Sequence, residues 1–174
     1  MSESFLDESI AILSRTPATL NTLLRDLPEP WTASNEGPNT WSPYDVIGHL
    51  IHGEHTDWMP RLEIILKHGP GRPFDRFDRQ AQFRESRGKS LSTLLDEFSE
   101  LRSANLRRLR SLNLQPAQLD ALGTHPELGP VNARQLLATW VAHDLDHIIQ
   151  ISRVMARRYK QQVGPWAQYL SVMK

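Results

Sequence analysis

Apolar residues recur at spacings of three and four along four long segments of the chain, a pattern typical of helices that bury one face. The pattern predicts a first helix over residues 5–27. Pro17 lies inside it and is expected to kink or split the helix near Thr16, because proline removes a helix hydrogen bond. The following stretch, 28–40, is rich in proline and glycine and is predicted to be a loop.

The predicted second helix has a clear start. Ser42 can cap it, Pro43 suits its first turn, and Asp45 follows the cap by three residues. We expect this helix to continue to the Gly-Pro-Gly sequence at 69–71 and to bend at Pro60.

The second half of the chain predicts two more helices. Residues 72–89 are polar and arginine-rich and are expected to form an ordered connection with room for a short helix. A third helix is predicted over residues 90–113, and 116–130 form a second long connection.

Asn132 and Gln135 form a capping-box pattern that starts a fourth helix, which is expected to reach about Gln161. Residues 164–174 are expected to pack back as one or two helical turns. No segment shows sustained alternation with a period of two, which is consistent with a helical fold. The prediction is an all-α fold, a four-helix bundle in a single domain over residues 1–174.

Composition narrows the classes of function. The 20 basic and 20 acidic residues balance, so neither a nucleic-acid backbone nor an anionic membrane is an expected partner. The arginine-rich stretch 72–110 also carries many acidic residues, which favours a solvated surface of mixed charge. Cysteine is absent, which excludes disulfides and thiolate ligands. The N-terminus lacks an apolar signal core, and a cytoplasmic location is expected.

The apolar face of the fourth helix includes two histidines. Its members follow one another by three or four residues: Leu136, Trp140, His143, His147, Ile151 and Val154. A buried imidazole needs partners for both ring nitrogens, and a shared cation can serve one nitrogen of each ring. The alternative is a pair of core histidines satisfied by carbonyl groups or water.

A metal site needs a third protein ligand, and the second helix offers His49, His52, His55 and Glu54. Helical geometry favours His49 over His52, because His49 lies nearer the buried face. Its i+4 neighbour, Gly53, is expected to leave space for a metal or a substrate. Three histidines with an open position are typical of a catalytic rather than a structural metal site, and Zn, Ni or Fe(II) would accept them.

Other polar residues near this pattern have competing interpretations. Asp144 and Asp146 flank the histidine pair and are interpreted first as a solvated face, with Asp144 and Glu54 as candidate general bases. His55 and His68 are expected to be exposed, and His125 lies in a loop that can reach the pocket. Four tryptophans are candidates for pocket walls or core packing, namely Trp41, Trp58, Trp140 and Trp166.

Two segments resemble motifs of the DinB/YfiT-like superfamily of metal-dependent four-helix-bundle proteins. The first is Trp-Ser-Pro-Tyr-Asp-Val-Ile-Gly-His-Leu at 41–50, and the second runs from Glu-Leu-Gly at 127–129 to His-Asp-Leu-Asp-His-Ile-Ile-Gln-Ile at 143–151. The resemblance implies an up-down-down-up bundle of the DinB/YfiT-like type, with long connections and a metal held by His49, His143, His147 and water.

The resemblance also implies a class of reaction. Relatives include transferases that add low-molecular-weight thiols to electrophiles, and a thiol-dependent isomerase. We therefore expect a metal-dependent S-transferase that uses a thiol cosubstrate such as bacillithiol, mycothiol or glutathione on a small-molecule substrate. A metal-dependent hydrolase is the first alternative, and a non-catalytic metal-binding or stress-response module is the second. A homodimer is also expected, because dimers are common and relatives often dimerise.

Overall fold

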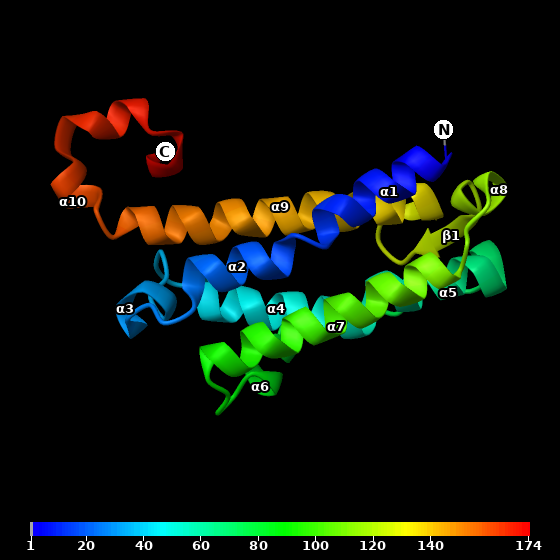
Figure 1. The fold of residues 1–174 in the computed structure, drawn as a ribbon, viewed down its shortest axis with the longest axis horizontal. Coiled ribbons are helices and arrows are strands. Elements are labelled where there is room, and N and C mark those ends of the chain that lie inside the picture. The colour runs from blue at the N-terminus through cyan, green and yellow to red at the C-terminus, as the bar shows by residue number, and fades with distance from the viewer. Residues whose placement is uncertain (1) are drawn as a thin grey trace.

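Four long helical segments form the body of the protein. The computed structural model describes residues 2–174. Two of the segments are interrupted and two are continuous, with these bounds: α1 (Ser2–Leu13), α2 (Thr16–Leu24), α4 (Pro43–Thr56), α5 (Trp58–His68), α7 (Leu91–Ser111) and α9 (Ala133–Arg157). Figure 1 shows that α1–α2 run one way, α4–α5 and α7 run the opposite way, and α9 returns. The bundle therefore has the expected up-down-down-up order.

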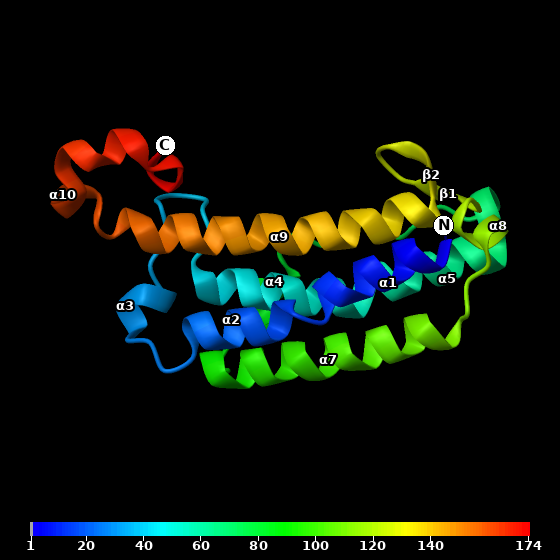
Figure 2. The ribbon, with the colours of Figure 1, turned by 45° about the horizontal axis from the view of Figure 1, so that its top comes forward.

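Short elements occupy the connections. They are α3 (Glu29–Thr32), η1 (Gly69–Gly71), α6 (Ala81–Glu85), α8 (Pro116–Leu119), β1 (Leu122–His125), β2 (Gly129–Asn132), α10 (Lys160–Val163), η2 (Gly164–Tyr169) and η3 (Ser171–Met173). The connection between α5 and α7 travels back along the bundle, which lets these two segments run in parallel (Figure 2). No helix among residues 2–174 is long and apolar enough to cross a membrane.

The predicted helix starts are confirmed by their caps. The hydroxyl of Ser42 accepts a hydrogen bond from the backbone N–H of Asp45, whose carboxylate accepts one from the backbone N–H of Ser42. Asn132 and Gln135 make the same reciprocal pair at the start of α9. Each pair satisfies two backbone donors that the first helical turn leaves free.

Prolines coincide with the two helix breaks. The first segment splits at residues 14–15, just before Pro17, as expected. The second breaks at Asp57, one turn before Pro60, because proline cannot donate to the carbonyl four residues earlier. Helix α9 ends at Arg157, earlier than predicted, and the remaining residues fold as short turns whose last one contacts α9.

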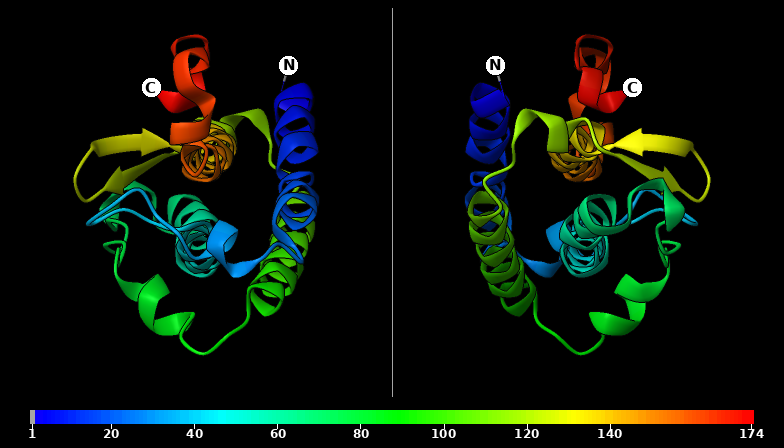
Figure 3. Two further views of the ribbon diagram at one scale, coloured as in Figure 1. Left: turned by 90° about the vertical axis from the view of Figure 1, so that its left-hand side faces the viewer. Right: turned by 90° about the vertical axis from the view of Figure 1, so that its right-hand side faces the viewer.

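The helical fold also carries one short hairpin that the sequence pattern did not indicate. β1 and β2 form an antiparallel hairpin in which Leu122 pairs with Asn132 and His125 pairs with Gly129. Each strand has only four residues, and β2 contains Pro130, so the sequence carries no alternation long enough to indicate them. Figure 3 shows the hairpin on the same side of the bundle as the loop before α4 and the connection after α5.

The core consists of two apolar clusters with polar side chains between them. One cluster, at the end where the chain begins, includes Leu13, Leu62 and Trp140, and the other includes Leu20 and Ile151. Buried polar residues from three helical segments interrupt the apolar packing between the clusters: His49, His52, Glu54, Arg102, Asp144 and His147. The site described next lies in this polar layer.

Candidate metal centre

Two long helical segments bring the three predicted histidines together. His143 and His147 lie one turn apart on α9, and His49 lies in the middle of α4. The Nε2 atom of His143 is 3.1 Å from Nε2 of His49 and 3.1 Å from Nε2 of His147. Ligand atoms of all three residues lie within 4.8 Å of one another.

This spacing suits a single divalent ion. Two nitrogens at about 2.0–2.1 Å from one zinc ion, separated by the tetrahedral angle, are about 3.4 Å apart. The two nitrogen separations of 3.1 Å are close to that value. Three imidazole donors leave a fourth position free, which is the donor set of catalytic zinc sites.

Burial keeps all three imidazoles neutral at neutral pH. Loss of solvent lowers the pKa of His49 to about 3, and the charge of His147 adds to the effect. Burial, followed by His147 and His49, lowers the pKa of His143 to about 2. The pKa of His147 is also lowered by burial, against hydrogen bonding to Gln150. A neutral imidazole has the lone pair that a metal ligand requires.

Gln150 orients one of the rings. Its Oε1 atom accepts a hydrogen bond from Nδ1 of His147 at 2.7 Å, which leaves the lone pair of that ring on Nε2. The Nδ1 atoms of His49 and His143 are buried and have no hydrogen-bond partner among the described residues. Gln82 of α6 is close enough to His49 to raise its pKa, and both of its amide atoms are buried and otherwise unpaired.

Aromatic rings enclose the histidines. The ring centroid of Trp41 is 4.8 Å from that of His49, and Phe77 presents its edge to His49 at 5.3 Å. On the other side, Trp58 packs edge-on against His143 at 5.0 Å. These side chains fix the ring positions by contact and reduce the access of water from those directions.

A cleft of about 340 Å³ opens on the histidines. His49 and His143 form part of its lining, together with Trp41, Phe77, Asp57, Arg61, Arg76, Arg79, His125, Pro126 and Glu127. Asp57 and Arg61 lie at the start of α5. The other lining residues outside α4 and α9 come from the loop before α4, the connection after α5 and the hairpin, and these three segments lie on one side of the bundle (Figure 3). A small molecule in this cleft would lie against two of the three imidazoles.

A buried charge cluster lies next to the histidines. The guanidinium of Arg102 donates from Nε and Nη2 to Oε1 of Glu54, at 2.9 and 2.7 Å, and from Nη2 to Oδ1 of Asp144 at 2.9 Å. Its Nη1 atom donates to Oδ2 of Asp144 and, at 3.0 Å, to the carbonyl of Leu13. All five N–H groups of Arg102 therefore have acceptors.

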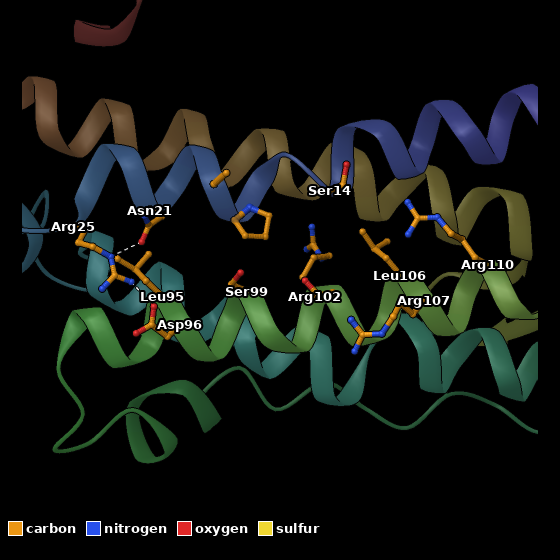
Figure 4. A pocket seen from close by; sticks show the side chains of 13 residues that line it. Ser14, Asn21, Arg25, Leu95, Asp96, Ser99, Arg102, Leu106, Arg107 and Arg110 are labelled. Atoms are coloured by element: carbon orange, nitrogen blue, oxygen red, sulfur yellow. Dashed lines mark hydrogen bonds and ion pairs between the residues drawn. The ribbon is translucent and has the colours of Figure 1, made fainter.

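The backbone carbonyl of Leu13 is free to accept this hydrogen bond because the first helical segment breaks after Leu13. In an unbroken helix, the N–H of residue 17 would donate to this carbonyl, but Pro17 has no N–H. Arg102 takes its place from α7, where it borders the groove between α7 and the α1–α2 pair (Figure 4). Burial opposes the charge of Arg102, but the hydrogen bonds and charges of Asp144 and Glu54 outweigh it and raise the pKa of the guanidinium.

The two carboxylates considered as general bases belong to this cluster. Glu54 also accepts hydrogen bonds from Asn105 at 2.9 Å and from Trp140 at 3.2 Å, and neither Glu54 nor Asp144 lines the cleft. The interpretation of Asp144 as part of a solvated face is wrong, because its exposed fraction is 0%. Asp146 is exposed, as that interpretation expected.

The remaining histidines are dispersed. His52 is buried and pairs through Nδ1 with Glu85 at 3.0 Å, so it is separate from the group of three. His55 and His68 are exposed, as expected. His125 is half-buried in β1 and lines the cleft, where its Nδ1 accepts hydrogen bonds from the backbone N–H groups at 127 and 128.

Gly53 and the tryptophans differ in part from expectation. The space beside Gly53 is filled by the indole of Trp58, whose Nε1 would lie 3.3 Å from an added Cβ, so the prediction of open space there is wrong.

Trp41 lines the cleft, whereas Trp58 and Trp140 stack in the core at 5.7 Å. Trp166 is exposed.

Sequence reasoning missed three residues that contact the site or its neighbours. Gln150 follows His147 by three residues, so helical spacing alone would have indicated their contact. Gln82 and Arg102 had no such signal, because their contacts join distant segments of the chain.

Comparison with known proteins agrees with this architecture. The family model of the DinB superfamily matches residues 12–151. The fold is similar to that of YfiT from Bacillus subtilis, described as a probable metal-dependent hydrolase with an unusual four-helix bundle topology. The TM-score is 0.72 at 21% sequence identity, over 89% of this chain and 87% of that chain. No curated protein matches the sequence. Because the family model spans most of its length, the chain belongs to the DinB superfamily.

Proposed function

We propose that this protein is a metal-dependent enzyme in which His49, His143 and His147 hold one divalent ion, zinc or nickel first and iron(II) as an alternative. The observation that carries the proposal is the convergence of three neutral imidazoles beside a cleft. A non-catalytic binding module is less well supported, because two of the three rings line that cleft.

A divalent ion held there would lower the pKa of a coordinated water or thiol and polarise a substrate oxygen. The chain itself supplies three neutral donors, aromatic walls and the cleft that receives the substrate. Glu54 and Asp144 act as positioning residues, because both carboxylates are committed to Arg102. Together they link α4 and α9, the helices that carry the histidines, through α7.

The reaction we propose first is transfer of a low-molecular-weight thiol to an electrophilic small molecule. The thiol gives its proton to solvent, a carbon–sulfur bond forms between the thiolate and the electrophilic carbon, and the leaving group departs with the electron pair of the bond that breaks. A thiol ionises near pH 8.5 and water near 15.7, so a thiol needs much less help from a base. This favours a thiol here, because the buried carboxylates nearest the histidines are already paired with Arg102.

Hydrolysis of a small molecule is the second candidate. It is supported by the fold shared with YfiT, itself described as a probable metal-dependent hydrolase. His125 and Glu127 line the cleft and are the side chains that can assist a water nucleophile there.

Paired assays on the zinc- and nickel-loaded protein separate the two reactions. Glutathione, bacillithiol and mycothiol are each tested with 1-chloro-2,4-dinitrobenzene, and p-nitrophenyl acetate is tested without thiol. We expect metal-dependent thioether formation that the His143→Ala variant lacks and the exposed-site control His55→Ala retains. Metal-dependent ester cleavage without thioether formation would instead establish the hydrolase. Equal rates in all three proteins would refute both candidates.

Domain organisation, location and oligomeric state complete the proposal. We infer that residues 1–174 form one domain, that the protein is cytoplasmic, and that it forms a homodimer. Sedimentation analysis of the purified protein tests the dimer directly, since a monomeric mass over a wide concentration range would contradict it.

A further inference from the structure

The cleft beside the histidines carries more positive than negative charge. Three arginines line it, Arg61, Arg76 and Arg79, against the carboxylates of Asp57 and Glu127. Arg61 is already committed, since its Nε lies 2.6 Å from Oδ1 of Asp57 and its guanidinium packs over the ring of Phe74. The positive charge available to a ligand in the cleft therefore comes from Arg76 and Arg79.

Arg76 and Arg79 form no ion pair with a carboxylate among residues 5–174, whose side chains the structure describes. They lie in the connection after α5, where acidic residues are available, but Asp75 pairs with Arg72 and Asp78 pairs with Arg84. Glu85, the remaining acid of this connection, pairs with His52, so each acid of the connection already has another partner. Both unpaired guanidinium groups belong to exposed residues that line the cleft.

At least one of these charges acts on the metal-binding residues. The charge of Arg79 is one of the influences that lower the pKa of His49. Arg79, His49 and His143 line the same cleft, and a fixed cation there opposes the binding of a divalent cation by repulsion. The repulsion is relieved when an anionic group of a bound molecule lies between them.

Glu127, on the hairpin, offsets part of this charge. It also lines the cleft, and its side chain has no ion-pair partner among the described residues. Two free guanidinium groups against one free carboxylate leave an excess of one positive charge. This excess matches one carboxylate group, whose two oxygens fit the fork of a guanidinium.

We propose that Arg76 and Arg79 bind a carboxylate of the substrate or thiol cosubstrate, so that the enzyme acts on small carboxylic acids whose reactive atom faces His49 and His143. The proposal rests on the proposed function for the meaning of the site, but the binding of the carboxylate does not require the metal. The two ideas can therefore fail separately.

Titration of the metal-free protein tests carboxylate binding directly. The side-chain Nε–H resonances of arginine are followed by NMR with propionate, with propionamide as its uncharged analogue and with inorganic phosphate as a competing oxyanion. We expect propionate to shift the signals of Arg76 and Arg79 and to bind about three- to tenfold more tightly than propionamide. Arg87→Gln is the matched control, because Arg87 is exposed in the same connection but does not line the cleft.

A second titration places the carboxylate relative to the metal. The cobalt-loaded protein is titrated with 3-mercaptopropionate and with 3-mercaptopropanol, and the thiolate-to-cobalt absorption band reports binding. The preference for the carboxylate should disappear in the Arg76→Gln/Arg79→Gln variant and persist in Arg87→Gln.

The two titrations separate the carboxylate site from the thiol reaction. No preference for propionate in the wild type, or a preference that survives in the double variant, overturns the carboxylate site. Tighter binding of phosphate than of propionate overturns the carboxylate assignment in favour of phosphate. Cobalt binding without a thiolate band refutes the thiol reaction alone, because the metal-free titration still decides the carboxylate site.

Discussion

The Nε2 atoms of His49 and His143 lie 3.1 Å apart, although 94 residues separate the two histidines in the chain. His143 is equally close to His147 and so has a central position among the three rings. This arrangement makes His143 the residue whose loss should affect metal binding most.

We expect His143→Ala to weaken divalent-metal binding by about 100-fold or more, since even the loss of a residue that orients a ligand costs about 10- to 100-fold. Elemental analysis after dialysis against a chelator measures the effect. His55→Ala, an exposed histidine on the same helix, should retain the metal content of the wild type. Equal metal content in His143→Ala and the wild type would remove the basis of the proposed function.

The metal-free protein should lose stability in acid. Burial lowers the pKa of His49 to about 3 and that of His143 to about 2, whereas the ordinary value is 6.5. Below that ordinary value the unfolded chain binds protons that the folded protein excludes. Stability present above pH 6.5 is therefore lost as the pH falls, by up to about 1.4 kcal/mol per pH unit for each histidine.

Denaturant unfolding from about pH 7 to about pH 4 measures this dependence. A His49→Asn/His143→Asn variant should show a shallower decline, and His55→Asn should follow the wild type. Parallel curves for the double variant and the wild type would contradict the prediction.

Arg102→Met should destabilise the protein by about 3–5 kcal/mol, because it leaves two buried carboxylates without their cation. Glu54 and Asp144 are 3% and 0% exposed, so water cannot replace the guanidinium without a structural change. Urea unfolding gives the difference in free energy. Arg108→Met is the control, since its ion pair with Glu63 is largely exposed, and such pairs contribute about 0–1 kcal/mol. A similar small effect at Arg102 would mean that the cluster is not needed for stability.

Gly48→Ala should destabilise the contact between α4 and α6. A Cβ on Gly48 would lie 2.3 Å from Oγ of Ser86, a buried side chain. We expect a cost of about 1–3 kcal/mol, as is typical of overpacking, and recovery of much of it in Gly48→Ala/Ser86→Gly. Thermal unfolding measures both, with Gly71→Ala as control because no atom lies within 4 Å of its added Cβ. Equal melting temperatures for Gly48→Ala and Gly71→Ala would contradict the close packing.

Local sequence signals predicted the helices well. Capping at Ser42 and Asn132 fixes where α4 and α9 begin, and helical spacing places His143 and His147 on one face. These features depend on residues three or four apart, so they can be recognised without knowledge of the fold.

Features that depend on contacts between distant segments could not be predicted in the same way. Asp144 looks like one more acid on a charged helix, and only the approach of Arg102 from α7 explains its burial. The hairpin strands are too short to show a pattern. The prediction of space beside Gly53 is wrong because Trp58 fills it, and Trp58 lies after a helix break that helical spacing alone does not indicate.

The polar layer between the two apolar clusters has a consequence for how the molecule unfolds. The two apolar clusters, one toward each end of the bundle, do not form one continuous hydrophobic core. The ion pairs of Arg102 with Glu54 and Asp144 lie between them. Cooperativity between the two ends therefore depends on a few charged groups rather than on a shared apolar interior. An ion bound by His49, His143 and His147 would tie α4 to α9 at the same level and so couple the two halves more tightly.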